Sequence, residues 1–119
     1  MALTRDFRDT VQVRARRDPA FRQALLQEGV ACLLAGDMDT GKAALRDYIH
    51  ATIGFAELAA QIHKPSKSLL RMFSSKGNPQ ARNLLEVIRY LQQQEGICLE
   101  VTMRRNLALS NQTDASGSS

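Results

Sequence analysis

The chain has no tryptophan, aromatic residues make up only 5% of it, and its two cysteines, Cys32 and Cys98, are far apart. A core poor in aromatic side chains must be built from Leu, Ile, Val, Ala and Met, which favours helices over a β-sandwich. Neither cysteine has a second Cys or a His at metal-ligand spacing, so neither a disulfide framework nor a zinc site is indicated. We expect two buried, reduced thiols and no bound metal.

Long apolar runs and catalytic patterns are also missing. No apolar run approaches the roughly 18 residues that cross a bilayer, and the first residues lack the apolar stretch of a secretion signal. The seven glycines are scattered rather than gathered in a phosphate-binding loop. His50 and His63 have no accompanying serine, cysteine and carboxylate pattern of a catalytic set. We therefore expect a cytoplasmic protein that does not bind membranes, is not an enzyme and needs no cofactor.

The length and the apolar content set the domain organisation. A chain of 119 residues with 44% hydrophobic residues fits one domain with its own core. We predict a single domain over residues 1–105. Residues 106–119 are rich in Ser and Asn and are expected to form a disordered tail.

Apolar residues at helical spacing predict an all-α fold of five to six helices. Asp18 before Pro19 is typical of a helix start, and Asp39 is the expected cap of the next helix. Asn78 and Pro79 are expected to begin the last helix, which Gly96 ends. The predicted helices cover residues 3–17, 19–34, 38–53, 55–62, 66–74 and 79–94.

A different periodicity follows the last helix. Ile97, Leu99, Val101 and Met103 alternate with more polar residues, and this period of two predicts a β-strand over residues 97–103. One lone strand cannot satisfy its backbone hydrogen bonds inside an otherwise helical chain. We therefore predict that it pairs with its copy in a second subunit.

The positive charge is concentrated in one part of the chain. The formal net charge is +4, and the stretch from Phe55 to Pro79 carries +3 of it. In that stretch four cations stand against the single acid Glu57; the cations are Lys64, Lys67, Arg71 and Lys76. A localised basic patch is typical of a surface that faces phosphates.

This basic stretch coincides with two short predicted helices, 55–62 and 66–74, joined by a tight turn. Such a pair is useful on DNA because the first helix braces the second, which lies in the major groove. The small Ala59 permits close approach of the two helices, and Leu58, Ile62 and Leu69 are expected to fill the core around it.

The remaining side chains of the second helix are expected on its outer side. Ser66, Lys67 and Arg71 are the candidates for contacts to DNA bases, with Arg71 able to form a two-pronged bond to guanine. The candidates for phosphate contacts are Lys64, Ser68, Lys76 and Asn78. The alternative is that these cations form an ordinary solvated helix face.

Specific strings in this region resemble a known family. Leu58-Ala59-Ala60-Gln61-Ile62, then Lys67 to Pro79 (KSLLRMFSSKGNP) and Asn83-Leu84-Leu85, are similar to the lambda-repressor/Cro-like helix-turn-helix regulators. More narrowly they resemble the addiction-module antidote branch, the antitoxins of toxin–antitoxin pairs. The resemblance covers about residues 41–101, with the helix-turn-helix core at 41–95. The chain departs from the family at His63, Lys64 and Pro65, where Gly, an apolar residue and a Ser or Thr cap are usual.

The resemblance implies a five-helix core, a homodimer bound to a near-palindromic DNA operator, and repression of the protein's own operon, with a toxin protein as a further partner. An alternative function belongs to another class. The chain would then be a protein-interaction module that neutralises a toxin, with little or no DNA binding, through its N-terminal helices or the strand. The sequence leaves both functions open.

Overall fold

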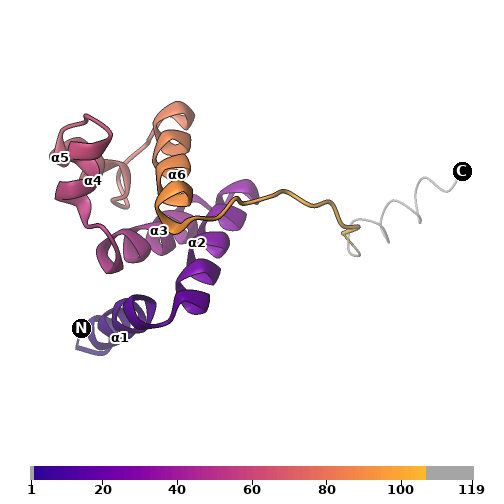
Figure 1. The fold of residues 1–119 in the computed structure, drawn as a ribbon, viewed down its shortest axis with the longest axis horizontal. Helices are drawn as coiled ribbons and strands as arrows, with labels where there is room; N and C mark the ends of the chain where they lie inside the picture. Colours follow the sequence, from indigo (N-terminus) through magenta and orange to yellow (C-terminus); the bar gives the residue numbers. More distant parts are fainter. Residues whose placement is uncertain (1, 107–119) are drawn as a thin grey trace, which may run out of the picture.

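The structure, a computed structural model, describes residues 2–106, and it describes side chains from Thr10 onward. Within these residues the chain is all-helical (Figure 1). The six helices are α1 (Ala2–Arg17), α2 (Pro19–Leu34), α3 (Met38–Ala51), α4 (Phe55–Gln61), α5 (Ser66–Met72) and α6 (Ala81–Glu95). In this part of the chain no helix is both long and apolar enough to span a bilayer.

Acidic caps begin two of the helices. The Asp18 side chain accepts a hydrogen bond of 3.2 Å from the backbone N–H of Phe21, which confirms the predicted start of α2. The cap of α3 is Asp37, which accepts a bond of 3.2 Å from the N–H of Thr40. The prediction of Asp39 was wrong because α3 begins at Met38, so Asp39 already lies inside its first turn.

The last helix begins later than predicted. It starts at Ala81, after Gln80, instead of at Asn78 and Pro79. The residues before it are held against the end of α5, where the backbone N–H of Gly77 donates to the carbonyl oxygen of Ser74 at 3.1 Å. Because this loop is fixed to α5, the chain enters the helix only after it has left that contact.

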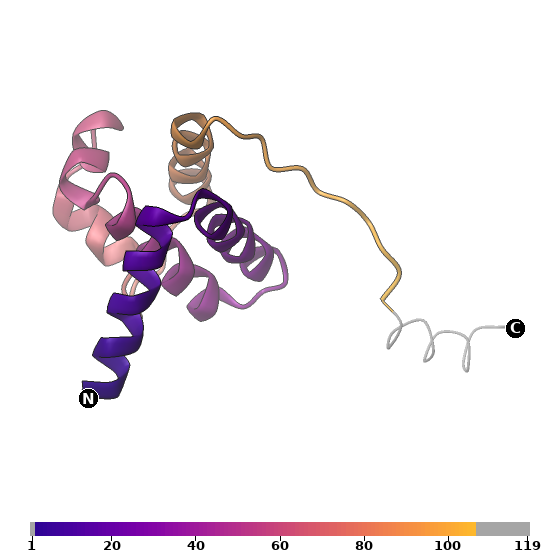
Figure 2. The ribbon, with the colours of Figure 1, turned by 60° about the horizontal axis from the view of Figure 1, so that its bottom comes forward.

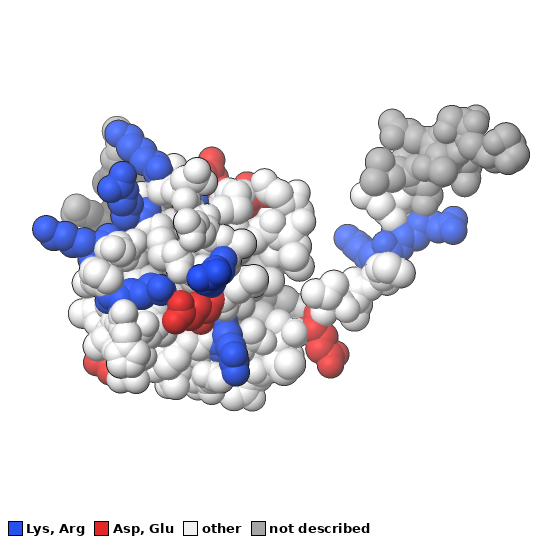
Figure 3. All heavy atoms as spheres, turned by 90° about the horizontal axis from the view of Figure 1, so that it is seen from above, with Lys and Arg blue, Asp and Glu red and all other residues white. Residues whose placement is uncertain are grey.

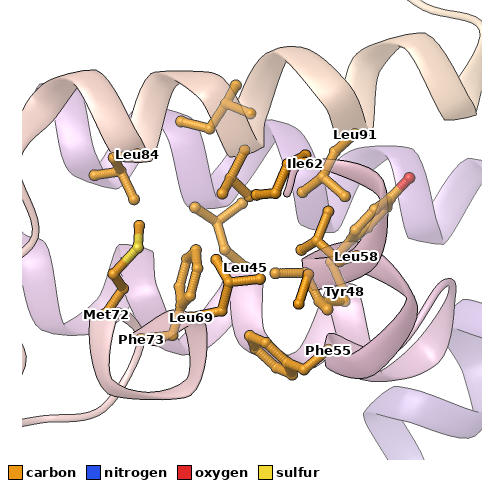
Figure 4. Close-up of a cluster of buried hydrophobic side chains, with 14 of the residues drawn as sticks. Leu45, Tyr48, Phe55, Leu58, Ile62, Leu69, Met72, Phe73, Leu84 and Leu91 are labelled. Carbon is orange, nitrogen blue, oxygen red and sulfur yellow. The ribbon is translucent and has the colours of Figure 1, made fainter. Parts of the chain in front are cut away.

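One core runs through the molecule, and α3, α4, α5 and α6 all contribute to it. Figure 4 shows side chains of the four helices converging, among them Leu45, Leu58, Leu69 and Leu91. Leu85 is 63% exposed, whereas Val87 is fully buried. The inner face of α6 follows the spacing i, i+3, i+4 and i+7 from Leu84, which excludes the next residue in the chain.

Five of the six described helices form two packed groups. α1, α2 and α3 pack against one another, and α4 packs against α5. Figure 1 shows α4 and α5 together at one end of the helical body. Figures 1 and 2 show residues 97–106 leaving the body from the other side, after the end of α6.

A polar network around Glu95 joins the end of α6 to the N-terminal helices. The buried carboxylate accepts bonds of 2.9 and 3.1 Å from Arg22 Nε, a bond of 3.3 Å from Gln23, and a bond from the Tyr48 hydroxyl. Arg22 also donates to the carbonyl oxygen of Ala15 at 3.1 Å. Burial raises the pKa of Glu95, but these bonds outweigh burial and hold the pKa below its ordinary value of 4.5.

The strand predicted at 97–103 is not present in the described chain, because residues 97–106 form neither helix nor strand. A strand needs a neighbouring strand to bond, and the described part of the chain offers none. Ile97 and Leu99 pack against the core, and the N–H of Leu99 donates to the Gln92 side chain at 2.7 Å. Val101 and Met103 continue the alternation but are 80% and 98% exposed.

Two smaller predictions concern the same segment. Cys98 is exposed and Cys32 is half-buried, so the expectation of two buried thiols was wrong. Cys98 stands between Ile97 and Leu99, which pack inward, and therefore faces away from the core. Of the predicted tail, 106–119, the structure describes only Asn106, and the rest lies outside the described residues.

Candidate nucleic-acid interface

The turn between α4 and α5 closes through backbone hydrogen bonds. The N–H of Lys64 donates to the carbonyl oxygen of Ala59 at 3.0 Å, across a left-handed residue, His63, with φ of 59°. This combination is the Schellman motif, which usually has glycine at the left-handed position. His63 therefore adopts a backbone conformation that is strained for residues other than glycine. The turn still closes with the same hydrogen bond that glycine at this position would allow.

The start of α5 relies on backbone geometry. Pro65 precedes the helix in an extended conformation, with φ of −63° and ψ of 138°, and its carbonyl oxygen accepts a bond of 3.2 Å from the N–H of Leu69. No side chain caps the helix. Leu69 and Met72 are buried, as is Phe73 just after the helix, and these three side chains fix which face of α5 points inward.

The opposite face of α5 carries cations. Lys67 and Arg71 are exposed and stand four residues apart, so they lie one above the other on the outward side. Neither side chain has an ion pair or hydrogen bond with any described residue. Ser66 and Ser68 are exposed on the same helix. Leu70 is 47% exposed beside them, and our sequence reasoning had given it no role.

The other three candidates lie outside α5. Lys64, in the preceding turn, forms an ion pair of 3.3 Å with Glu86 of α6, so its charge is partly neutralised within the chain. Lys76 and Asn78 are exposed in the loop after α5. The structure thus gathers Ser66, Lys67, Ser68 and Arg71 on one helix, adds two residues from the next loop, and directs Lys64 toward α6.

That loop is held by a buried lysine. Lys42 of α3 is 3% exposed, and its Nζ donates to the carbonyl oxygens of Ser74 and Gly77 at 2.8 and 2.9 Å. Gly77 also lies close to the end of α5, where a Cβ on this residue would be 1.9 Å from the carbonyl oxygen of Arg71. Only glycine fits at this position. Cations near the last carbonyls of a helix are also favoured by its dipole. Lys42 therefore positions the loop that carries Lys76 and Asn78.

We assigned no role to Lys42 and Arg46 from the sequence. A signal was present, because Lys42 stands three residues before Leu45 and so lies on the inner face of α3. Arg46 Nη1 donates to the carbonyl oxygen of Phe73 at 3.1 Å, which adds a second tie from α3 to the end of α5. Two side chains of α3 are thus bonded to three backbone carbonyl oxygens in the segment that follows α5.

The surface charge is uneven at the scale of the whole molecule. Figure 3 shows Lys and Arg side chains on the side of the helical body away from residues 97–106, the side on which α1, α4 and α5 lie in Figure 1. A surface of this kind attracts polyanions, and its attraction depends on the salt concentration. In the described part of the chain, no three His, Cys, Asp or Glu side chains are grouped so that they could hold a metal ion.

Comparison with known proteins finds no family model, no curated protein and no solved structure that matches this chain.

Proposed function

We propose that the protein is a sequence-specific DNA-binding transcriptional regulator in which α4 and α5 form a helix-turn-helix of the lambda-repressor/Cro-like type. The observation that carries this proposal is the exposed pair Lys67 and Arg71, one turn apart on a helix whose other face is buried. Their charges have no partner among the described side chains, so they are available to an external polyanion.

In this proposal α5 lies in the major groove and α4 braces it from behind. Arg71 forms the two-pronged bond to guanine O6 and N7, Lys67 acts as a point charge on neighbouring acceptors, and Ser66 contacts a base or phosphate. Ser68, Lys76 and Asn78 bind phosphates and fix the register of the helix on DNA. Lys64 contributes least, because its ion pair with Glu86 must be exchanged for any contact with DNA.

The regulator acts as a homodimer. Two copies of α5 would enter successive major grooves about 34 Å apart, which requires a near-palindromic operator. Residues 97–103 supply the contact between subunits by pairing with their own copy, since Val101 and Met103 are exposed and the backbone there has no strand partner within the described chain. Binding at the promoter of its own operon would make the protein an autorepressor.

The resemblance to the antidote branch extends the proposal to an antitoxin. A second candidate function, a protein-interaction module that neutralises a toxin without binding DNA, is favoured by one observation: Val101 and Met103 expose apolar surface on residues 97–106. The unpaired cations of α5 favour the regulator. A protein that bound a toxin through residues 97–106 would not need exposed, unpaired cations on α5.

The two functions differ in what the purified protein does with its own upstream DNA. A regulator binds this duplex at least about 100-fold more tightly than a scrambled duplex of equal composition. The logarithm of its affinity falls with the logarithm of salt with a slope of about −4 to −7, as expected for four to eight neutralised phosphates. Equal binding to both duplexes, or a flat salt response, would reject the regulator in favour of the interaction module.

A further inference from the structure

The guanidinium of Arg46 is hydrogen-bonded through one of its nitrogens and has no hydrogen-bond partner at the other two in the described chain. Its Nη1 donates to the carbonyl oxygen of Phe73 at 3.1 Å, which fixes the plane of the group against the end of α5. Its Nε is buried and has no hydrogen-bond partner in the described chain. Nη2, which lies beside Nε, has no partner there either. The Nε and Nη2 donors together form the fork that binds oxyanions through two parallel bonds.

A buried, unpartnered N–H of a charged group is costly. Leaving such a donor without an acceptor costs about 1–3 kcal/mol, and more for an ion. Natural structures rarely keep such a group without a reason, and a ligand is one of the reasons known. An acceptor that reaches this edge of Arg46 would recover that free energy on binding.

A small pocket is lined in part by Arg46. It has a volume of about 60 Å³, and it is lined by Asp39, Lys42, Ala43, Arg46, Phe73 and Ser75. This volume admits one compact group and excludes a base or a large side chain. Two cations and one acid are among the lining residues, so the pocket favours a group with a single negative charge. Ser75 adds a hydroxyl, which can donate to an oxygen acceptor.

We propose that this pocket binds the oxyanion of one phosphate group, with Nη2 of Arg46 as the first donor and Nε as the second once the atoms that cover it shift. Ser75 is a third donor, and Lys42 adds positive charge to the lining. Asp39 is the competing acceptor and weakens the site. The phosphate comes either from the backbone of a duplex lying along α5, a source that rests on the proposed function, or from free inorganic phosphate. In the first case Arg46 clamps the backbone next to the end of α5 and the following loop.

The direct test observes the Nε–H of Arg46 by ¹H–¹⁵N NMR of the full chain, during separate titrations with inorganic phosphate and with the upstream duplex. The resonance is assigned by its loss in Arg46→Lys. A shift and slower exchange with solvent in either titration are expected. A shift with the duplex identifies the backbone as the source, and a shift with inorganic phosphate alone identifies the free ion.

Variants measure the same site independently. Arg46→Lys keeps the charge but lacks the fork, and it should weaken binding of the active phosphate source by about tenfold. Asp39→Asn removes the competing acid and should strengthen binding about threefold. Arg89→Lys, at an exposed arginine of α6, is the control and should change nothing. Circular dichroism establishes that each variant is folded, and the two deciding titrations are carried out on the natural sequence.

A resonance that neither phosphate nor the duplex moves would overturn the proposal, as would wild-type binding of both by Arg46→Lys. These results are separable from the fate of the proposed function. If the upstream duplex binds and the Nε–H of Arg46 does not move in either titration, the regulator stands and the phosphate site fails. If the duplex does not bind but inorganic phosphate shifts the resonance, the site stands and the regulator fails.

Discussion

Lys42 Nζ lies 2.9 Å from the carbonyl oxygen of Gly77, so a buried cation of α3 holds the backbone that follows α5. The same ammonium group donates to the carbonyl oxygen of Ser74 at 2.8 Å. No carboxylate of the described chain pairs with this lysine. Its contribution is therefore the satisfaction of carbonyl groups at a helix end, and it orients the loop next to the proposed DNA-binding surface.

Replacing Lys42 with methionine keeps the length of the side chain but removes its donors. The carbonyl oxygen of Gly77 then loses its lysine donor, and that of Ser74 keeps only the Gly77 N–H, both at partly buried residues. The free energy of unfolding should therefore fall by roughly 1–3 kcal/mol. Urea unfolding measures this. The same substitution at the exposed Lys67 should change stability by no more than about 0.5 kcal/mol. Equal losses at both positions would contradict the role assigned to Lys42.

The turn between α4 and α5 can be stabilised by one substitution. His63 has φ of 59°, where glycine is unstrained, so His63→Gly should raise the free energy of unfolding by about 0.5–1 kcal/mol. His50→Gly, inside α3, should instead lower it by about 1 kcal/mol or more. Urea unfolding of both variants tests the pair. A loss of stability in His63→Gly would show that the imidazole makes a favourable contribution there.

The Glu95 network gives the fold a defined response to acid. The pKa of Glu95 is lowered from 4.5, so on acidification the unfolded chain takes up this proton before the folded one does. Its contribution to stability is complete above about pH 5 and is lost as the pH falls through 4.5 to the lower pKa of the folded state.

Glu95→Gln removes this charge and should lower stability at pH 7 by roughly 2–3 kcal/mol. The variant should also lose less stability than the wild type between about pH 5 and pH 3, because the linked proton is gone. Urea midpoints measured across this range, with the exposed Glu100→Gln as control, test both statements. Parallel pH curves for wild type and Glu95→Gln would contradict them.

Leu70 adds an exposed apolar side chain to the proposed DNA-binding surface. It is 47% exposed beside Arg71, and an apolar side chain on a recognition helix can contact the methyl group of thymine. Replacing thymine by deoxyuridine at one operator position should weaken wild-type binding about fourfold, the effect of one buried methyl group. Leu70→Ala should not distinguish the two duplexes. If no single position shows this difference for the wild type, Leu70 does not contact a thymine methyl.

Much of the fold follows from local patterns. Proline after an acidic cap, glycine at left-handed helix ends, and helical spacing of apolar residues predicted all six helices, because each depends on neighbours in the sequence. The start of α6 was wrong by two residues. Its position depends on the contact between Lys42 and Gly77, which lie far apart in the chain. Patterns among neighbouring residues cannot predict such a contact.

The candidate site shows the same division. The outward position of Lys67 and Arg71 could be predicted, because burial of Leu69 and Met72 fixes the rotation of α5. The pairing of Lys64 with Glu86 could not be predicted, since it depends on where α6 passes. Arg46 and its pocket were missed for the same reason. In the proposed dimer, Val101 and Met103 contact a second subunit. Their role therefore follows neither from the alternation of apolar residues in the sequence nor from the structure of a single chain.

The most direct measurement compares two charge-matched double variants by fluorescence anisotropy with the upstream duplex. Lys67→Ala with Arg71→Ala removes two cations from α5, and Arg16→Ala with Arg17→Ala removes two exposed cations from α1. The first pair should weaken binding by about 100-fold or more and reduce the salt slope by roughly one to two units. The second should stay within about threefold of the wild type. Equal affinities for the two double variants would contradict a DNA-reading role for α5.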